Sequence, residues 1–234
     1  MERLAQAKSL LGAVFKLRIT GQITSESTEK LKKQLNQIKM QRPVALAVVI
    51  NSMGGSASQS NLIREELLSY VNRKKIKLYC FAEEYAGSGG YLILSAGNEV
   101  YSARSSLIGS IGARFSFFDV SELASSYGIK RRKWSTSEKD LDLRLDPLSP
   151  LSAEAQNWMK EILGNSTEQL QKLISEKRGK ISQNAFTGEL FNSKEASDMG
   201  LVDGLGTCDQ TMAKLYPENK IVDLGKNFLG LDKF

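Results

Sequence analysis

The sequence predicts an α/β fold built on a parallel sheet. The segment 44–50 (VALAVVI) is a continuous apolar run rich in β-branched residues, which is typical of a central strand covered on both faces. This run and a second apolar run at 76–82 are each followed by a glycine-rich turn and a helical stretch. Two strand–turn–helix units in succession imply parallel pairing through right-handed crossovers.

The other elements are expected on both sides of these two units. Apolar and basic residues alternate at 14–19, which predicts a strand. The helices are expected at about 25–40, 56–72, 89–97, 119–127, 152–178 and 193–199, and short strands at 100–103, 201–203 and 221–223. The side chains expected to face inward are Leu62, Ile63, Leu67 and Leu68 on the second helix, and Trp158, Ile162, Leu170, Leu173 and Ile174 on the fifth.

Composition limits the classes of function. The chain has 234 residues, 41% of them hydrophobic, which is enough to bury a real core. The net charge is +6, but the basic residues are spread out, so no nucleic-acid partner is predicted. No apolar run approaches the roughly 20 residues that span a bilayer. The sequence leaves open the compartment and whether an anchor or targeting segment preceded Met1.

The chain contains no histidine, and its two cysteines, Cys80 and Cys208, are far apart. Every catalytic arrangement that needs histidine is therefore excluded, and so is every metal site with a histidine ligand. No metal and no cofactor are predicted. A serine nucleophile in this chain would need a different base.

Ser88 is the candidate nucleophile. It stands among Gly87, Gly89 and Gly90, directly after a predicted strand and before an apolar helical run. Backbone N–H groups at such a helix start are unpaired and could stabilise a negative oxygen. The Gly54–Gly55 pair also follows a strand, so both turns are expected at the same edge of the sheet. Taken alone, each turn fits a plain connecting loop better than a functional site.

Lysine is the base that remains for such a serine. An ordinary lysine, with a pKa near 10.4, is neutral in roughly 4 molecules per 10,000 at pH 7. The base must therefore be a lysine whose amine enters a desolvated pocket, where its pKa falls. Composition does not choose among the lysines.

Four segments of the chain resemble the signal peptide peptidase A (protease IV) family of serine peptidases, which shares a fold with the Clp protease subunit and the crotonases. They are Val48–Gly55, Ala86–Tyr91 (AGSGGY), Ile108–Gly112 (IGSIG) and the closing stretch 188–206, with Gly200-Leu201-Val202-Asp203. The order and spacing of the four carry the resemblance, which spans about residues 14–215. It implies a Clp/crotonase-like fold of repeated β-β-α units.

The resemblance also implies a role for particular residues. Ser88 would be the nucleophile, and the amides of Gly55 and Gly89 would form the oxyanion hole. Lys139 would be the general base, with Lys133 as the fallback, and Ser110 would orient the lysine amine. The chain departs from the family pattern at Met53, where a proline is expected, and at 136–138 (TSE), just before Lys139.

One peptidase domain over 1–234 is expected. Its parts are a core at 13–128, a lysine-bearing loop at 129–151, a helical part at 152–215 and a tail at 216–234. The residues expected to contact substrate are Gly54, Leu92, Ile108 and Ile111, with Ile93 and Phe115 adding to an apolar wall. These residues favour hydrophobic extended peptides, such as signal-peptide remnants or membrane-protein segments, bound as a strand beside Gly54–Gly55. The resemblance further implies a ring-like homo-oligomer and proximity to a membrane.

Two other functions fit the same sequence. A crotonase-like acyl-CoA enzyme would use the paired glycine amides for a thioester enolate, with Glu83 or Glu84 as the nearest carboxylates. An inactive assembly or membrane-adaptor protein would keep the fold without the reaction.

Overall fold

The computed structural model describes residues 12–136 and 145–225. The chain divides into two compact units, one of residues 1–112 with 170–234 and the other of residues 113–169. The second unit begins before the predicted loop 129–151 and includes the first part of a long helix, α7 (Ala153–Arg178). The expected single peptidase domain stays a prediction.

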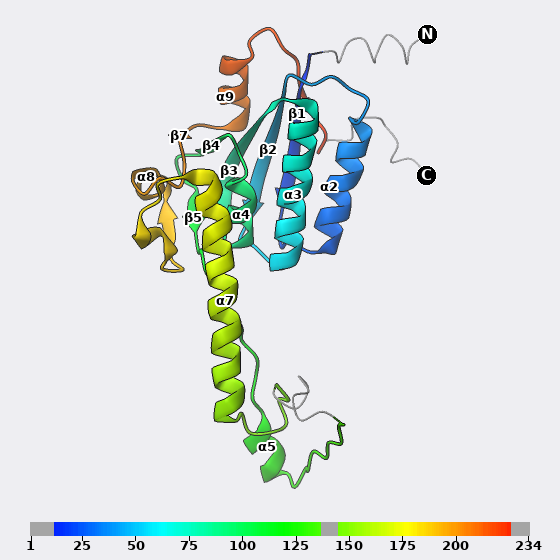
Figure 1. The fold of residues 1–234 in the computed structure, drawn as a ribbon, viewed down its shortest axis with the longest axis vertical. Coiled ribbons are helices and arrows are strands. Elements are labelled where there is room, and N and C mark those ends of the chain that lie inside the picture. The colour runs from blue at the N-terminus through cyan, green and yellow to red at the C-terminus, as the bar shows by residue number, and fades with distance from the viewer. Residues whose placement is uncertain (1–11, 137–144, 226–234) are drawn as a thin grey trace. The chain divides into compact units, whose positions relative to one another are not determined.

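The first unit is organised around a sheet with the strand order β6-β5-β3-β2-β1-β8 (Figure 1). Its bounds are β1 Val14–Thr20, β2 Ala45–Ser52, β3 Lys77–Gly87, β5 Leu107–Gly109, β6 Leu190–Asn192 and β8 Ile221–Asp223. Every pair along this order is parallel except β5 with β6. A short strand, β4 (Glu99–Ser102), pairs with the first half of β3 and with β7 (Gly204–Leu205). The predicted α/β fold with a mostly parallel sheet is confirmed.

Helices cover both faces of the sheet. On one face, α2 (Ser25–Gln37) and α3 (Ala57–Lys74) lie side by side, and α4 (Gly89–Leu94) packs against α3 (Figure 1). Alternate residues of β1, namely Phe15, Leu17 and Ile19, join the main core on this face. On the other face, Cys208 and Met212 of α9 (Cys208–Leu215) pack against a smaller cluster of strand side chains. Because both faces are covered, β2 is buried along nearly its whole length, as its apolar run predicts.

The basic residues of β1 are not a solvated face. The Lys16 side chain is 4% exposed, and its Nζ lies 2.6 Å from Oδ1 of Asp209 on α9 and 3.4 Å from Oδ2 of Asp223 on β8. Arg18, further along, donates to Glu83 and Asp223. The alternation therefore predicts the strand correctly, but the polar partners are distant in the chain: Glu83 is 65 residues from Arg18, and Asp209 and Asp223 are about 200 residues from Lys16 and Arg18.

Several sequence expectations about elements are wrong. Residues 201–203 are not a strand: Leu201 and Val202 are buried in the core after the short helix α8 (Ser193–Asp198), and pairing begins only at Gly204. The strands β5 and β6 and the helix α9 were not expected. Leu62 is 46% exposed and Ile162 is 43% exposed, so neither faces inward as predicted.

The second unit contains α5 (Ser121–Ser126) and the first part of α7. The amide of Val120 donates to the carbonyl of Pro147, which ties the two chain segments of this unit together. Within the described residues, no helix is long and apolar enough to cross a membrane.

A partly buried ion pair joins the end of α7 to Asp203, which is hydrogen-bonded to β4. Arg178, with 6% of its side chain exposed, donates through Nη1 and Nη2 to the two carboxylate oxygens of Asp203, at 2.8 Å each. Asp203 also accepts from the amide of Val100 at 2.7 Å. Burial alone would raise the pKa of Asp203, but the Arg178 and Val100 donors outweigh it and lower the pKa below 3.8.

We expect Asp203→Ala to lower the free energy of unfolding by about 1–3 kcal/mol at pH 7, because it leaves the buried Arg178 guanidinium without its acceptor. The pKa of Asp203 is lower in the folded than in the unfolded chain, so its contribution is present above about pH 4 and lost as the pH falls further. Urea unfolding should therefore show a difference between variant and wild type that shrinks in acid. The control is Asp198→Ala, which removes an exposed pair with Lys194 and should lower the stability much less. Equal losses for the two variants would contradict this account.

Candidate active site

Ser88 lies at the junction between β3 and α4, in a strained backbone conformation. Its φ is 50° and its ψ is −117°, and a positive φ is rare for a residue with a Cβ atom. Its amide donates to the carbonyl of Gly109 at 2.8 Å, and its carbonyl accepts from the amide of Leu92 at 3.0 Å. These bonds fix the serine at the carboxyl end of β3, and strain of this kind is common at functional sites.

A bulge in β3 precedes Ser88. Ile50 of β2 pairs with Ala82, but Ser52 pairs with Ala86, so Glu83, Glu84 and Tyr85 stand out of register. At this point β3 changes its other neighbour from β4 to β5. The bulge therefore redirects the last residues of β3, which carry Ser88, away from the line of the first half.

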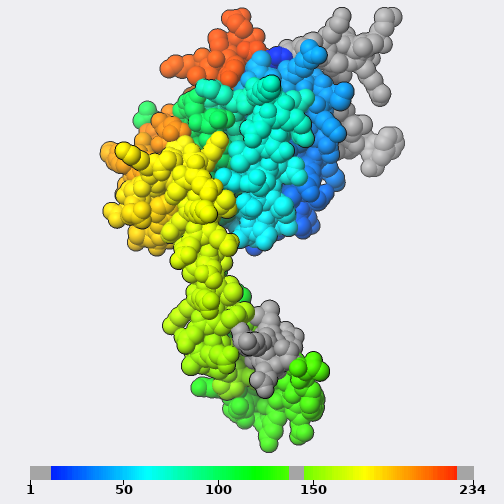
Figure 2. Space-filling model, in the orientation of Figure 1, coloured from blue at the N-terminus to red at the C-terminus, as the bar shows by residue number. Residues whose placement is uncertain are grey.

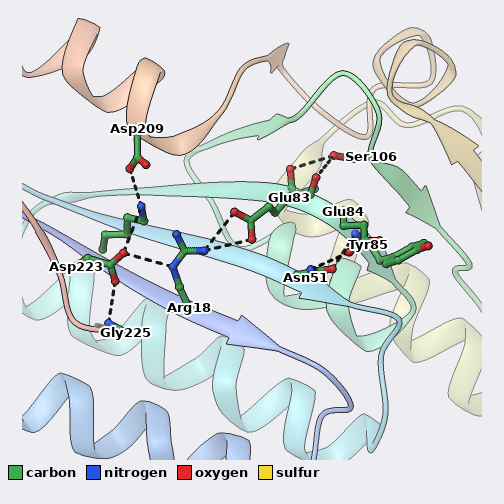
Figure 3. A network of polar contacts seen from close by, with 11 residues as sticks. Arg18, Asn51, Glu83, Glu84, Tyr85, Ser106, Asp209, Asp223 and Gly225 are labelled. Atoms are coloured by element: carbon green, nitrogen blue, oxygen red, sulfur yellow. Dashed lines mark hydrogen bonds and ion pairs between the residues drawn. The ribbon is translucent and has the colours of Figure 1, made fainter. Parts of the chain in front are cut away.

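Polar side chains from neighbouring segments hold this bulge (Figure 3). Asn51 accepts from the amide of Tyr85 and donates to Oε2 of Glu84, both at 3.2 Å. The Ser106 hydroxyl lies 3.1 Å from the carbonyl oxygen of Ala82 and 2.9 Å from that of Glu83. Both carboxylates considered for the acyl-CoA alternative are thus engaged, Glu84 with Asn51 and Glu83 with Arg18.

The Gly54–Gly55 turn lies directly against Ser88. A Cβ atom on Gly54 would come within 3.0 Å of the Ser88 Cβ, the Gly87 carbonyl oxygen and the Gly89 nitrogen, and its φ is 104°. A Cβ on Gly55 would collide with the backbone of Ile23. Ile23 donates to the Gly54 carbonyl at 3.0 Å and accepts from Ser56 at 2.9 Å. The turn is therefore a backbone-to-backbone contact that tolerates no side chain.

The amides of the two predicted oxyanion-hole residues are free of backbone partners. In the described part of the chain, Gly55 N makes no hydrogen bond. Gly89 is the first residue of α4, where an amide has no carbonyl within its own helix. By contrast, Gly54 N donates to the Ser52 hydroxyl at 3.1 Å. The structure thus brings Gly54 against Ser88 and leaves the amides of Gly55 and Gly89 without a backbone partner.

Ser110 borders the same junction. Its φ is 48°, and its amide donates to the carbonyl of Glu189 at 2.6 Å. A Cβ on Gly87 would lie 3.5 Å from the Ser110 Cβ, which is ordinary contact. Of the three residues other than glycine with positive φ in the described ranges, Ser88 and Ser110 therefore lie beside one another, and Lys75 ends α3.

Sequence reasoning missed the residues that support this junction. The hydroxyl of Ser60 on α3 packs on Gly89, leaving no room for a side chain there. The Ser52 hydroxyl donates to the Gly21 carbonyl at 2.6 Å, and a Cβ on Gly90 would lie 2.5 Å from the Ser52 carbonyl oxygen. No local pattern marks these serines, because each is defined by a contact about 30 residues away.

The apolar residues predicted to contact substrate are in the core. Leu92 is 3% exposed, and Ile93, Ile108 and Ile111 are fully buried among the main cluster. Phe115 belongs to the second unit and is 49% exposed. Their role in substrate binding stays a prediction, and it would require the buried side chains to become accessible.

Lys139, the predicted base, lies outside the described residues. Lys133, the fallback, lies in the second unit, with Nζ 2.9 Å from Oδ2 of Asp146. The amide of Leu148, then Lys133 and Ser149, lower the pKa of Asp146 to about 2. Asp146 is therefore a carboxylate at neutral pH and already holds the Lys133 amine.

Other nucleophiles and metals gain no support. Burial raises the pKa of both Cys80 and Cys208 to about 12, so neither supplies a thiolate near neutral pH. Among the residues described, no group of three or more cysteine, aspartate or glutamate side chains could hold a metal ion.

The fold and the serine junction define a class of protein: an α/β protein with a strained serine and two glycine amides at the carboxyl edge of a parallel sheet. The family model "Peptidase family S49" matches residues 71–222. The chain belongs to this family, as the resemblance to signal peptide peptidase A implies.

The similar proteins include two that are named as proteases and one that is named as an antiporter. The chain is 32% identical over 192 residues to "Na(+)/H(+) antiporter NhaA" of Brucella abortus, a match that covers 80% of this chain and 26% of that protein. It is 24% identical to "Putative signal peptide peptidase SppA" of Enterococcus faecium (81% of this chain, 56% of that one). It is 23% identical to "Probable protease SohB" of Haemophilus influenzae (90% and 60%). The chain thus spans between about a quarter and three fifths of these three relatives.

A solved structure supports the fold. A variant of the 1510-N membrane-bound stomatin-specific protease aligns with a TM-score of 0.56 over 87% of this chain and 84% of that chain, at 14% identity. At this identity the likeness concerns the fold alone.

The strained backbone at Ser88 predicts that a glycine variant is more stable than an alanine variant at this position. Ser88→Gly should unfold with a free energy about 1 kcal/mol higher than Ser88→Ala, because glycine adopts a positive φ without steric cost. Chemical denaturation of the two variants measures this difference. At Ser95, where φ is −63°, the same pair should show the opposite order, with glycine about 0.5–1 kcal/mol less stable. If alanine were the more stable replacement at position 88, the backbone would not be strained there.

Proposed function

We propose that this chain is a serine peptidase in which Ser88 is the nucleophile and Lys139 the general base. The observation that carries the proposal is the strained Ser88 junction, with Gly54 packed against it and the amides of Gly55 and Gly89 without backbone partners. Membership of peptidase family S49 supports the peptidase class.

The proposed reaction has two steps. The Ser88 hydroxyl oxygen attacks the carbonyl carbon of the scissile peptide bond, and its proton passes to the neutral lysine amine. The carbonyl oxygen becomes an oxyanion and accepts hydrogen bonds from the Gly55 and Gly89 amides. The carbon–nitrogen bond then breaks, and the lysine returns the proton to the leaving amine. In the second step a water molecule, deprotonated by the lysine, hydrolyses the acyl-serine ester and frees Ser88.

Lys139 is proposed as the base on the strength of the family resemblance. Lys133 is the weaker choice because its amine is already paired with Asp146. The Ser110 hydroxyl would accept a hydrogen bond from the lysine amine and orient it, and its place beside Gly87 supports that role.

The proposed substrates are hydrophobic extended peptides, such as signal-peptide remnants or segments of membrane proteins. Such a peptide would add as a strand beside Gly54–Gly55. Leu92, Ile108 and Ile111 are buried in the core and are not part of this proposal. A homo-oligomer is proposed as the working form, as in the family that the chain resembles.

Labelling with a fluorophosphonate probe tests the nucleophile and the base together. We expect the wild-type chain to be labelled, Ser88→Ala not at all, and Lys139→Ala far more slowly. Hydrolysis of a hydrophobic peptide should fall about 10⁴-fold or more in Ser88→Ala. The controls are Ser105→Ala and Lys180→Ala, which remove the same groups from exposed positions and should label normally. Labelling of Ser88→Ala would refute the nucleophile, and normal labelling of Lys139→Ala would refute the base.

A lysine base also predicts the pH profile. The amine accepts a proton only when it is neutral, so peptide hydrolysis should rise between pH 7 and about pH 9. Initial rates of the wild-type chain, measured over this range at fixed ionic strength, test the expectation. A profile that is flat or falls over the same range is incompatible with lysine as the base.

A further inference from the structure

Met53 presents an exposed apolar side chain at the junction around Ser88. It precedes Gly54, is 47% exposed and stands where the family pattern has proline. Among the described residues, the other exposed large apolar side chains of the first unit lie outside the turns at 53–55, 87–90 and 109–112. An exposed apolar group beside a candidate nucleophile is a candidate contact for a ligand.

The backbone on both sides of Met53 is fixed. The Ser52 hydroxyl donates to the Gly21 carbonyl at 2.6 Å and accepts from the Gly54 amide at 3.1 Å. The Met53 backbone itself packs on the last residue of β3, since a Cβ atom on Gly87 would lie 3.3 Å from the Met53 carbonyl oxygen and 3.5 Å from its Cα. The side chain therefore starts from a fixed point beside the end of β3.

The segment that carries Met53 is open to solvent. Residues 55–58 are exposed, whereas Gly54 is buried against Ser88. These residues lead into α3, whose atoms form part of the surface of the first unit and are cyan in Figure 2. A peptide that adds as a strand beside Gly54–Gly55 would therefore pass the Met53 side chain.

We propose that Met53 is a specificity-determining residue that contacts an apolar side chain of the peptide close to the scissile bond. This inference rests on the proposed peptidase function and names the source of its preference for hydrophobic peptides. The thioether lies on an unbranched, flexible side chain, so it can adapt to leucine, phenylalanine or methionine in the substrate. A charged substrate side chain at the same place would lose water without gaining a partner. The expected substrates therefore carry a large apolar residue, of loosely defined shape, near the bond that is cut.

Other side chains near the junction are buried or already engaged. The predicted apolar contacts within the first unit belong to the main core: Leu92, Ile93, Ile108 and Ile111. Of the carboxylates in the β3 bulge, Glu83 pairs with Arg18, and Glu84 accepts from Asn51. A basic residue of the substrate would have to displace one of these contacts, whereas an apolar residue finds the Met53 side chain already exposed.

Kinetics on internally quenched peptides test the proposal. The peptides carry leucine, phenylalanine, lysine or glutamate in turn at each position next to the cleaved bond. Met53→Ala should lower kcat/KM for the apolar peptides about 10-fold through a higher KM, because the lost contact is made in the ground state as well as in the transition state. Met53→Leu should keep the wild-type preference. Met53→Glu should reverse it, so that a peptide with lysine at one of these positions becomes the better substrate.

Met40→Ala is the matched control. Met40 is also exposed, at 88%, but it precedes β2 and so lies toward the amino end of the strand whose carboxyl end leads into Met53. Its removal should leave the order of preferred peptides unchanged. Thermal unfolding of Met53→Ala should stay close to that of the wild-type chain, because a substitution of an exposed side chain changes stability little.

Fluorophosphonate labelling separates this inference from the proposed function. The probe carries no peptide side chain, so the wild-type chain and Met53→Ala should both be labelled. If both are labelled and Met53→Ala and Met53→Glu keep the wild-type order of preferred peptides, Met53 does not set specificity and the inference is overturned. If neither chain is labelled, the peptidase proposal fails, and this inference fails with it.

Discussion

The candidate site depends on the contact between two backbones at the end of β2 and the end of β3. Gly54 can approach Ser88 only because it has no side chain, and Gly55 can cross Ile23 for the same reason. On the other side of the junction, Gly89 and Gly90 allow α4 to start against Ser60 and Ser52. The chain conformation at Ser88 is costly in isolation, and it persists because hydrogen bonds and close packing on every side leave no alternative.

The bulge in β3 places the carboxyl end of this strand, and with it Ser88, beside β5. Without the three residues out of register, the last part of β3 would continue beside β4, and its carboxyl end would not meet β5. Asn51 and Ser106 supply the hydrogen bonds that the bulged backbone loses from the regular ladder. On the face of the sheet that α9 covers, polar side chains also fix the geometry. There Lys16 and Arg18 of β1 form ion pairs with residues of α9, β8 and β3. The polar residues thus fix the geometry of a sheet whose remaining interior is apolar.

The two compact units carry different chemistry. The first holds the sheet and the serine junction, and the second holds exposed aromatic side chains and a run of four cations. The chain also matches only a part of each of three relatives considered above, one of which is named as an antiporter and two as proteases.

The sequence by itself determined the order of the main strands and helices, the parallel pairing and the place of Ser88. These follow from local periodicity and from glycines at strand ends, both of which are visible in short windows of sequence. Only the tertiary structure decided that Lys16 is buried, that β3 is bulged, that Ser60 and Ser52 support the junction, and that Leu92, Ile108 and Ile111 lie in the core. The reason is physical: each of these properties is a contact between segments distant in the chain, and a window of sequence holds only one of the two partners.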